Sequence, residues 1–226
     1  MLLEEILDQA LRKSTPHEQA GNFLGEHVTR PRYAIGKNPE TLAVHELAPL
    51  DGIIDDYAQQ GEAWHGIPLL RTVDAARNAR VINCSTSIRP VDVLEHLQRS
   101  GFGDVINIAD LVRASDGALP WPRLVEAQRR EMAGNLDVWQ AIHDELADEE
   151  SRKTLLDVLR FRLTADPDYM HGYKVRLAEQ YFEDFMQYRE ETFVDAGGYD
   201  GDTSEAFAKR IPITERSSSL SHRKRT

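Results

Sequence analysis

The chain has 226 residues, of which 41% are hydrophobic, and this is enough for a buried core in one large domain or two modest ones. The formal net charge of −11 disfavours nucleic acid or an anionic membrane as a partner, because either would need a basic surface to neutralise phosphate. The single cysteine, Cys84, excludes an intrachain disulfide and any cysteine cluster that could hold zinc or iron.

The N-terminal segment MLLEEILDQALRK carries acidic residues within an interrupted apolar stripe, which is typical of an amphipathic helix and not of a signal peptide. No apolar run in the sequence approaches the roughly 20 residues that are needed to span a bilayer. We therefore expect a cytoplasmic protein in a reducing compartment, with a small-molecule substrate as its partner and neither nucleic acid nor membrane.

Residues 1–29 are expected to form one or two helices, with Ser14-Thr15-Pro16 as the break between them. From residue 30 the pattern changes to short β-prone runs separated by segments that favour helix. These runs are Tyr33–Gly36, Gly52–Ile54, Arg80–Cys84 and Asp104–Ile108. The clearest intervening helix is PVDVLEHLQR at 90–99. The alternation predicts a small parallel sheet, and we assign residues 30–118 to a Rossmann-like accessory domain.

Pro120-Trp121-Pro122 marks a boundary, and a helical apolar stripe follows it. Further helices are predicted at about 152–163 and about 173–188. We assign residues 119–190 to a helical connector that leads into a strand near Thr192.

The C-terminal residues differ in composition from the rest of the chain. From Lys209 onward there are six basic residues and one acidic residue, and after Ile213 only Leu220 is strongly apolar. Such a segment cannot bury enough surface to fold, so residues 211–226 are predicted to be a disordered basic tail. The tail is interpreted either as a binding segment for an acidic partner or as an accidental end of an interrupted coding sequence.

The segment FVDAGGYDGDTSEAF at 193–207 combines a β-prone start, glycines that free the turn from Cβ atoms, and a helix start. Glycine turns of this kind let the backbone approach a ligand at the end of a strand in α/β folds. We expect Thr203 or Ser204 to cap a helix that is entered at Glu205, with N–H groups that favour polar or anionic ligand atoms. The pattern alone leaves open a turn that binds nothing.

The run VDAGGYDGDTSEAF, preceded by EQYFEDFMQYREETF, resembles the entry to the methyltransferase domain of the FkbM family, whose first motif has the form F-V-D-x-G-x-x-x-G-x-T. More weakly, GIIDDYAQQGEAWHGIPLL and ARVINCSTSIRPVDVLEHLQRSGF resemble the Rossmann-like region that precedes this domain in some members. The matching parts cover about residues 30–207, and only 193–207 is specific.

The resemblance implies S-adenosylmethionine as cofactor and transfer of its methyl group to a hydroxyl of a sugar or small molecule. It implies that Asp195, Gly197 and Gly201 shape the cofactor site and that Asp202 and Thr203 border it. Tyr181 is a further candidate for the wall of the cofactor site. Because it lies on an apolar helical stripe, packing in the core is the alternative prediction.

The implied fold class is α/β, with a Rossmann-like N-terminal region, a helical connector, and the first strand, turn and helix of a class I methyltransferase domain at 191–210. About 20 residues follow the turn, whereas a complete site needs further strands and an acidic residue on the next strand. We therefore expect a truncated and inactive chain.

Two alternative functions remain open. In the first, residues 30–112 form a non-catalytic module that binds a nucleotide or sugar nucleotide, since Asp55 and Asp56 lie about 20 residues after Gly36. The segment GKNPETL is not G-x-G-x-x-G, so a loop with two solvated aspartates competes with this interpretation. In the second, an exposed terminal strand pairs with another chain.

The remaining reactive residues are assigned structural roles. The eight histidines have no ligand spacing, so no metal site is predicted. Cys84 lies in an apolar strand and is interpreted as a small buried residue and not as a nucleophile. The acidic run at 144–150 is expected to form a solvated helix face.

Overall fold

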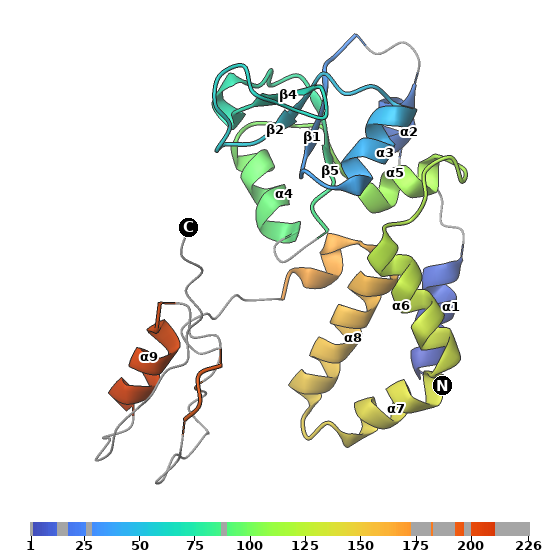
Figure 1. The fold of residues 1–226 in the computed structure, drawn as a ribbon. Coiled ribbons are helices and arrows are strands. Elements are labelled where there is room, and N and C mark those ends of the chain that lie inside the picture. The colour runs from blue at the N-terminus through green and yellow to red at the C-terminus, as the bar shows by residue number, and fades with distance from the viewer. Residues whose placement is uncertain are drawn as a thin grey trace. The chain divides into compact units, whose positions relative to one another are not determined.

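The structure is a computed structural model that describes residues 2–12, 18–25, 29–86, 90–172, 182, 193–196 and 200–210. The chain divides into two compact units, Met1–Gly172 (unit 1) and Tyr173–Thr226 (unit 2), which are taken separately below. Figure 1 shows the sheet and most helices in unit 1 and helix α9 in unit 2. The predicted domain boundaries stay predictions.

Unit 1 contains a six-stranded sheet in the order β3-β4-β2-β1-β5-β6. All neighbouring strands are parallel except β3 and β4. The strands are β1 (Arg32–Ile35), β2 (Gly52–Ile54), β3 (Ala63–Trp64), β4 (Ile67–Leu70), β5 (Arg80–Asn83) and β6 (Val105–Asn107). Four of them confirm the predicted strands, and the α/β fold class is confirmed.

The sheet is covered on both faces, because alternate residues of each strand point to opposite sides. On β1, Ala34 belongs to one apolar cluster and Tyr33 to another. The first face is covered by α2 (Glu18–Leu24), α3 (Pro39–Leu47) and α5 (Ile108–Ala114), and the second by α4 (Pro90–Arg99). Covered faces of this kind explain why the strands read as nearly continuous apolar runs.

The hairpin of β3 and β4 was missing from the sequence-based prediction. Its two-residue turn is His65-Gly66, and both residues have positive φ, at 50° and 83°. Such a turn matches the twist of the two strands. β4 was not predicted because it contains Pro68, and a proline inside an apolar run argues against a paired strand.

A helical layer in unit 1 surrounds a third apolar cluster. It consists of α1 (Leu2–Leu11), α6 (Arg123–Gly134), α7 (Leu136–Glu145) and α8 (Glu149–Thr164), followed by the 3-10 turn η2 (Pro167–Met170). A further 3-10 turn, η1 (Thr72–Asp74), follows β4. Leu3 of α1, Met132 of α6 and Leu163 of α8 are fully buried in this cluster.

Arg129 joins several parts of this helical layer. Its guanidinium donates to the carbonyls of Ala10 (3.0 Å) and Leu163 (2.9 Å), which lie in the last turns of α1 and α8, and it lies 4.2 Å from the ring centroid of Trp121. A cation at these carbonyls satisfies acceptors that a helix end leaves without partners.

The acidic residues at 144–150 are exposed, as expected, but they do not lie on a single helix. α7 ends at Glu145, and Asp148 is the N-cap of α8, where its carboxylate accepts from the backbone N–H of Ser151 at 2.7 Å. A capping carboxylate favours a helix start at this point over a continuous helix.

Unit 2 differs from its prediction at 193–195. Phe193, Val194 and Asp195 belong to no strand, and Ala196 makes a single bridge. A parallel strand is stable only beside hydrogen-bonded neighbours, and the described part of unit 2 contains no second strand. The hypothesis of an exposed terminal strand that pairs with another chain stays a prediction. The predicted helix at 173–188 and the tail at 211–226 lie outside the described residues, except for Phe182.

Candidate functional site

The turn that the sequence singles out is held by a contact between Asp195 and Ser204. The Ser204 hydroxyl donates to Asp195 Oδ2 at 2.7 Å, and both side chains are partly buried. This contact ties the segment before the glycine turn to the first turn of α9 (Asp202–Arg210). The sequence singled out Asp195 and missed Ser204 as its partner.

α9 begins earlier than predicted. The Glu205 N–H already donates to the carbonyl of Gly201 at 2.9 Å, so Glu205 lies inside the helix. Gly201 has φ of +88°, a conformation that suits glycine at this position. The expectation that Thr203 or Ser204 caps a helix entered at Glu205 is therefore wrong, since both residues lie in the first helical turn.

Carboxylates already occupy the N–H groups at the start of α9. The Thr203 N–H donates to Asp202 Oδ1 at 2.7 Å, and the Asp202 N–H donates to Asp200 Oδ1 at 3.3 Å. Together with Asp195, these aspartates make the turn acidic. The turn therefore suits a positively charged ligand group better than the anionic atoms that a bare helix start attracts.

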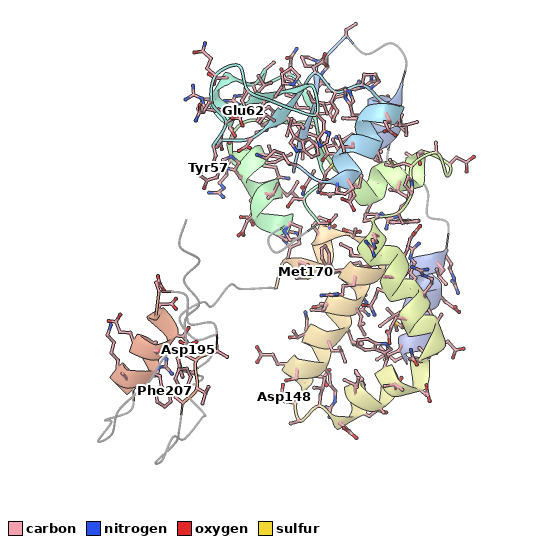
Figure 2. All side chains as sticks on the ribbon, in the orientation of Figure 1. Tyr57, Glu62, Asp148, Met170, Asp195 and Phe207 are labelled. Carbon is pink, nitrogen blue, oxygen red and sulfur yellow. The ribbon has the colours of Figure 1, made fainter. Side chains whose placement is uncertain are left out.

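Three phenylalanines form an aromatic cluster next to this turn. Phe193 stacks on Phe207 with ring centroids 4.3 Å apart, and Phe182 lies 6.0 and 5.9 Å from these two rings. Arg210 donates to the Phe182 carbonyl and lies 5.8 Å from the Phe182 ring centroid. The cluster fixes both ends of the turn, because Phe193 precedes it and Phe207 lies within α9. Figure 2 shows Asp195 and Phe207 close together in unit 2.

Four of the six predicted cofactor residues lie in the described part of the turn. They are Asp195, Gly201, Asp202 and Thr203. The other two, Gly197 and Tyr181, lie outside the described residues. The structure thus assembles an acidic corner from the described residues of this segment, and the role of that corner in binding is a separate question.

A second candidate site lies at the carboxyl edge of the unit 1 sheet. After β1 the chain enters α3 on the first face, and after β5 it enters α4 on the second face. This reversal between neighbouring strands is a topological switch point, where open parallel sheets bind ligands. Gly36 sits there with φ of +107°, and a Cβ on it would lie 3.4 Å from backbone atoms of Cys84 and Ser85.

The N-terminus of α3 at this edge is a poor phosphate site. The Asn38 side chain accepts from the Thr41 N–H at 2.9 Å and donates to the Cys84 carbonyl at 2.7 Å. Pro39 has no N–H to offer, and Glu40 adds a negative charge to the first turn. A dinucleotide pyrophosphate would find no free cradle of N–H groups here, as the absence of G-x-G-x-x-G also indicates.

Neither aspartate after β2 is simply solvated, which corrects that interpretation. Asp55 Oδ2 pairs with Lys37 Nζ at 2.6 Å, and the pair lowers the pKa of Asp55 and raises that of Lys37. Asp56 accepts from the backbone N–H and the hydroxyl of Thr72 at 2.7 and 2.9 Å. His96 Nε2 lies 3.3 Å from Asp56 Oδ2.

Cys84 is fully buried, and desolvation raises the pKa of its thiol to about 12, so its interpretation as a structural residue is confirmed. Within the described ranges, no group of three or more His, Cys, Asp or Glu side chains is placed to hold a metal ion. Among the described helices, none has the length and apolar character that a membrane crossing requires.

No protein-family model matches the sequence, and no curated protein matches it. The structure, however, matches the crystal structure of methyltransferase FkbM from Methylobacillus flagellatus KT with a TM-score of 0.56 and 19% sequence identity. The match covers 92% of this chain. The fold is that of an FkbM methyltransferase. The resemblance to the FkbM family is thus confirmed at the level of the fold.

This chain spans about 60% of the length of the FkbM structure that it matches. At 19% identity the similarity establishes the common fold, whereas function depends on the residues of a site. The activity, cofactor and substrate of the whole FkbM protein therefore enter only as proposals for this chain.

Proposed function

We propose that this chain belongs to an S-adenosylmethionine-dependent methyltransferase of FkbM type, which methylates a hydroxyl group of a sugar or another small molecule. The observation that carries the proposal is the FkbM fold over 92% of the chain, combined with the motif residues Asp195, Gly201 and Thr203 at one structured turn. The fold supports the lineage, and the motif supports the location of the cofactor.

The chemistry of the turn fits this cofactor. S-adenosylmethionine supplies a reactive methyl group on a positively charged sulfonium, and its methionine part carries an ammonium group. Asp195, Asp200 and Asp202 give the turn a negative charge that complements both cations. Gly201 leaves the backbone open, because no atom of the described residues beyond its chain neighbours lies within 4 Å of the Cβ position that a side chain would occupy.

In this proposal the protein contributes mainly to positioning. Ser204 orients the Asp195 carboxylate by donating to one of its oxygens, so that the other oxygen remains available to accept from the cofactor. The aromatic cluster of Phe182, Phe193 and Phe207 packs the residue before the turn against α9. Alignment of the reacting groups is the main source of rate enhancement when the cofactor carries the reactivity.

Ultraviolet crosslinking of radiolabelled S-adenosylmethionine, followed by peptide mapping, tests this assignment. We expect label in the peptide that contains residues 193–210 and loss of that label when S-adenosylhomocysteine competes. Substituting Asp195→Asn would reduce the label, and Asp168→Asn in unit 1 is the matched control. Absence of label from this peptide at saturating cofactor would contradict the proposal.

We further propose that a polypeptide of residues 1–226 alone does not transfer a methyl group. Its described residues supply one wall of a cofactor site, whereas a class I site also takes contacts to the ribose and adenine from neighbouring strands. Isothermal titration of this polypeptide with S-adenosylmethionine should therefore give no binding at micromolar affinity. Clear micromolar binding would overturn this second proposal and would leave the assignment of the cofactor site to the turn at 193–210 unaffected.

A further inference from the structure

Two apolar side chains at the carboxyl edge of the unit 1 sheet are unusually exposed. Tyr57 follows β2 and is 97% exposed, and Val73 follows β4 and is 71% exposed. β2 and β4 are hydrogen-bonded neighbours with parallel register, so their carboxyl ends lie side by side. Figure 2 labels Tyr57 on the connection between β2 and β4.

A polar bridge fixes the spacing between these two loops. Asp56, the neighbour of Tyr57, binds both the N–H and the hydroxyl of Thr72, the neighbour of Val73. His96 of α4 contacts the same hydroxyl at 3.2 Å. The exposed tyrosine and valine therefore stand on loops that are tied together, and their exposure does not come from a loosely held loop.

Groups that bind hydroxyls lie directly beside this apolar pair. Asp55 directly follows β2, 19 positions after Gly36, and pairs with Lys37 from the loop after β1. A carboxylate at the end of this strand is the group that binds ribose hydroxyls in open α/β sheets. The Tyr57 N–H donates to Asp55 Oδ1 at 3.0 Å, which places the tyrosine backbone next to the carboxylate.

We propose that this edge binds a ribonucleoside, with its base stacked on Tyr57 and its ribose diol on Asp55. The base would stack on an aromatic ring that is otherwise exposed to water, and stacking of this kind is tolerant of base identity. The N-terminus of α3 lacks a free cradle of N–H groups for a diphosphate, because of Pro39, Glu40 and the Asn38 cap. The site should therefore bind a nucleoside about as well as the corresponding nucleoside diphosphate. This site is separate from the turn at 193–210 and goes beyond the proposed methyl transfer.

Adenosine and uridine, each also as its 5′-diphosphate and its 2′,3′-dideoxy form, are the probes, with binding followed by NMR on the 226-residue chain. We expect shifts at Tyr57, Val73 and Asp55, binding of ribonucleosides about 10-fold tighter than of dideoxynucleosides, and less than about 3-fold gain from the diphosphate. Tyr57→Ala should weaken binding at least about 5-fold. Tyr169→Ala, another exposed tyrosine in unit 1, should leave it unchanged.

Asp55→Asn should remove the preference for the ribose diol while leaving base binding in place. Because Tyr57 is almost wholly exposed, its alanine variant should unfold at the same temperature as the parent, which separates lost binding from lost folding. Any of three results would overturn the proposal: no shift with any probe at millimolar concentration, equal binding by the parent and Tyr57→Ala, or a 100-fold gain from the diphosphate.

Discussion

The two glycine turns of this chain share a backbone conformation but differ in what surrounds them. Gly36 and Gly201 both have positive φ, at 107° and 88°, and each is followed by a helix. A Cβ on Gly36 would contact the backbone of the neighbouring β5 loop at 3.4 Å, whereas among the described residues no atom beyond the chain neighbours lies within 4 Å of the corresponding position on Gly201. The first turn is built into a sheet, and the second is supported by an aromatic cluster and by local hydrogen bonds such as that from Ser204 to Asp195. A turn motif therefore indicates lineage, whereas its neighbours decide how rigid it is.

The largest expected effect is the loss of the aromatic support in unit 2. Phe207→Ala removes a buried ring that stacks on Phe193, and such a truncation costs about 3 kcal/mol in a packed core. We expect the resonances of residues 193–210 to lose their dispersion while unit 1 unfolds unchanged. An equal loss of stability in unit 1 would contradict the view that the two turns are supported independently.

Gly36→Ala should destabilise unit 1 by about 2 kcal/mol, because alanine at φ of +107° is strained and its Cβ crowds the β5 loop. Gly201→Ala should leave the denaturant midpoint of unit 1 unaltered. Urea unfolding followed by tryptophan fluorescence measures both variants, since Trp64 and Trp121 lie in unit 1. Equal effects of the two substitutions on that midpoint would contradict the account.

Arg129→Met should cost unit 1 about 1.5 kcal/mol, since it removes donors to the carbonyls of Ala10 and Leu163. Burial lowers the pKa of Arg129, which shows that its charge is partly desolvated. Replacing it with methionine removes this desolvation cost, and the gain offsets part of the lost hydrogen bonding. Arg130→Met is the neighbouring control, because Arg130 is exposed and donates only to the Glu126 carbonyl of its own helix. The same urea experiment should show a smaller midpoint shift for this control.

The smallest effects concern pH, and two aspartates of unit 1 should act in opposite directions. Burial raises the pKa of Asp166, so the stability that its proton contributes is complete below the unfolded pKa and is lost as pH rises through the folded value. The ion pair with Lys37 lowers the pKa of Asp55, so its contribution is present above the unfolded pKa and is lost as pH falls.

The parent protein should lose stability above about pH 4 as Asp166 ionises, and Asp166→Asn should abolish this loss. The parent should also lose stability below about pH 4 as Asp55 becomes protonated, and Asp55→Asn should abolish that second loss. Thermal unfolding midpoints between about pH 3 and 7 would show two difference curves of opposite slope. Curves of the same sign would refute these assignments.

Much of the unit 1 sheet could be predicted from the sequence, because its strands are buried on both faces and appear as apolar runs such as RVIN at 80–83. β4 could not be predicted, since Pro68 interrupts its apolar run and its short pairing with β3 depends on the His65-Gly66 turn. The motif also predicted a strand at 193–195, and the described residues Phe193, Val194 and Asp195 form none, since β propensity alone does not determine a strand.

The candidate site was predictable in its glycine and carboxylate positions and not in its contacts. Ser204 carries no signal that marks it as the partner of Asp195, because the two residues meet only when α9 starts at Asp202. The same holds for Tyr57 and Val73, which lie 16 positions apart and are brought to one edge by the pairing of β2 with β4.

The central claim is that the turn at 193–210 contacts S-adenosylmethionine through Asp195. An amide NMR titration of the 226-residue chain with this cofactor tests the claim most directly, with Asp195→Asn titrated in parallel. The account predicts shifts at Gly201, Thr203 and Ser204 that increase up to millimolar cofactor and disappear in the variant. Unchanged resonances at these three residues in the parent chain, or equal shifts in parent and variant, would contradict it.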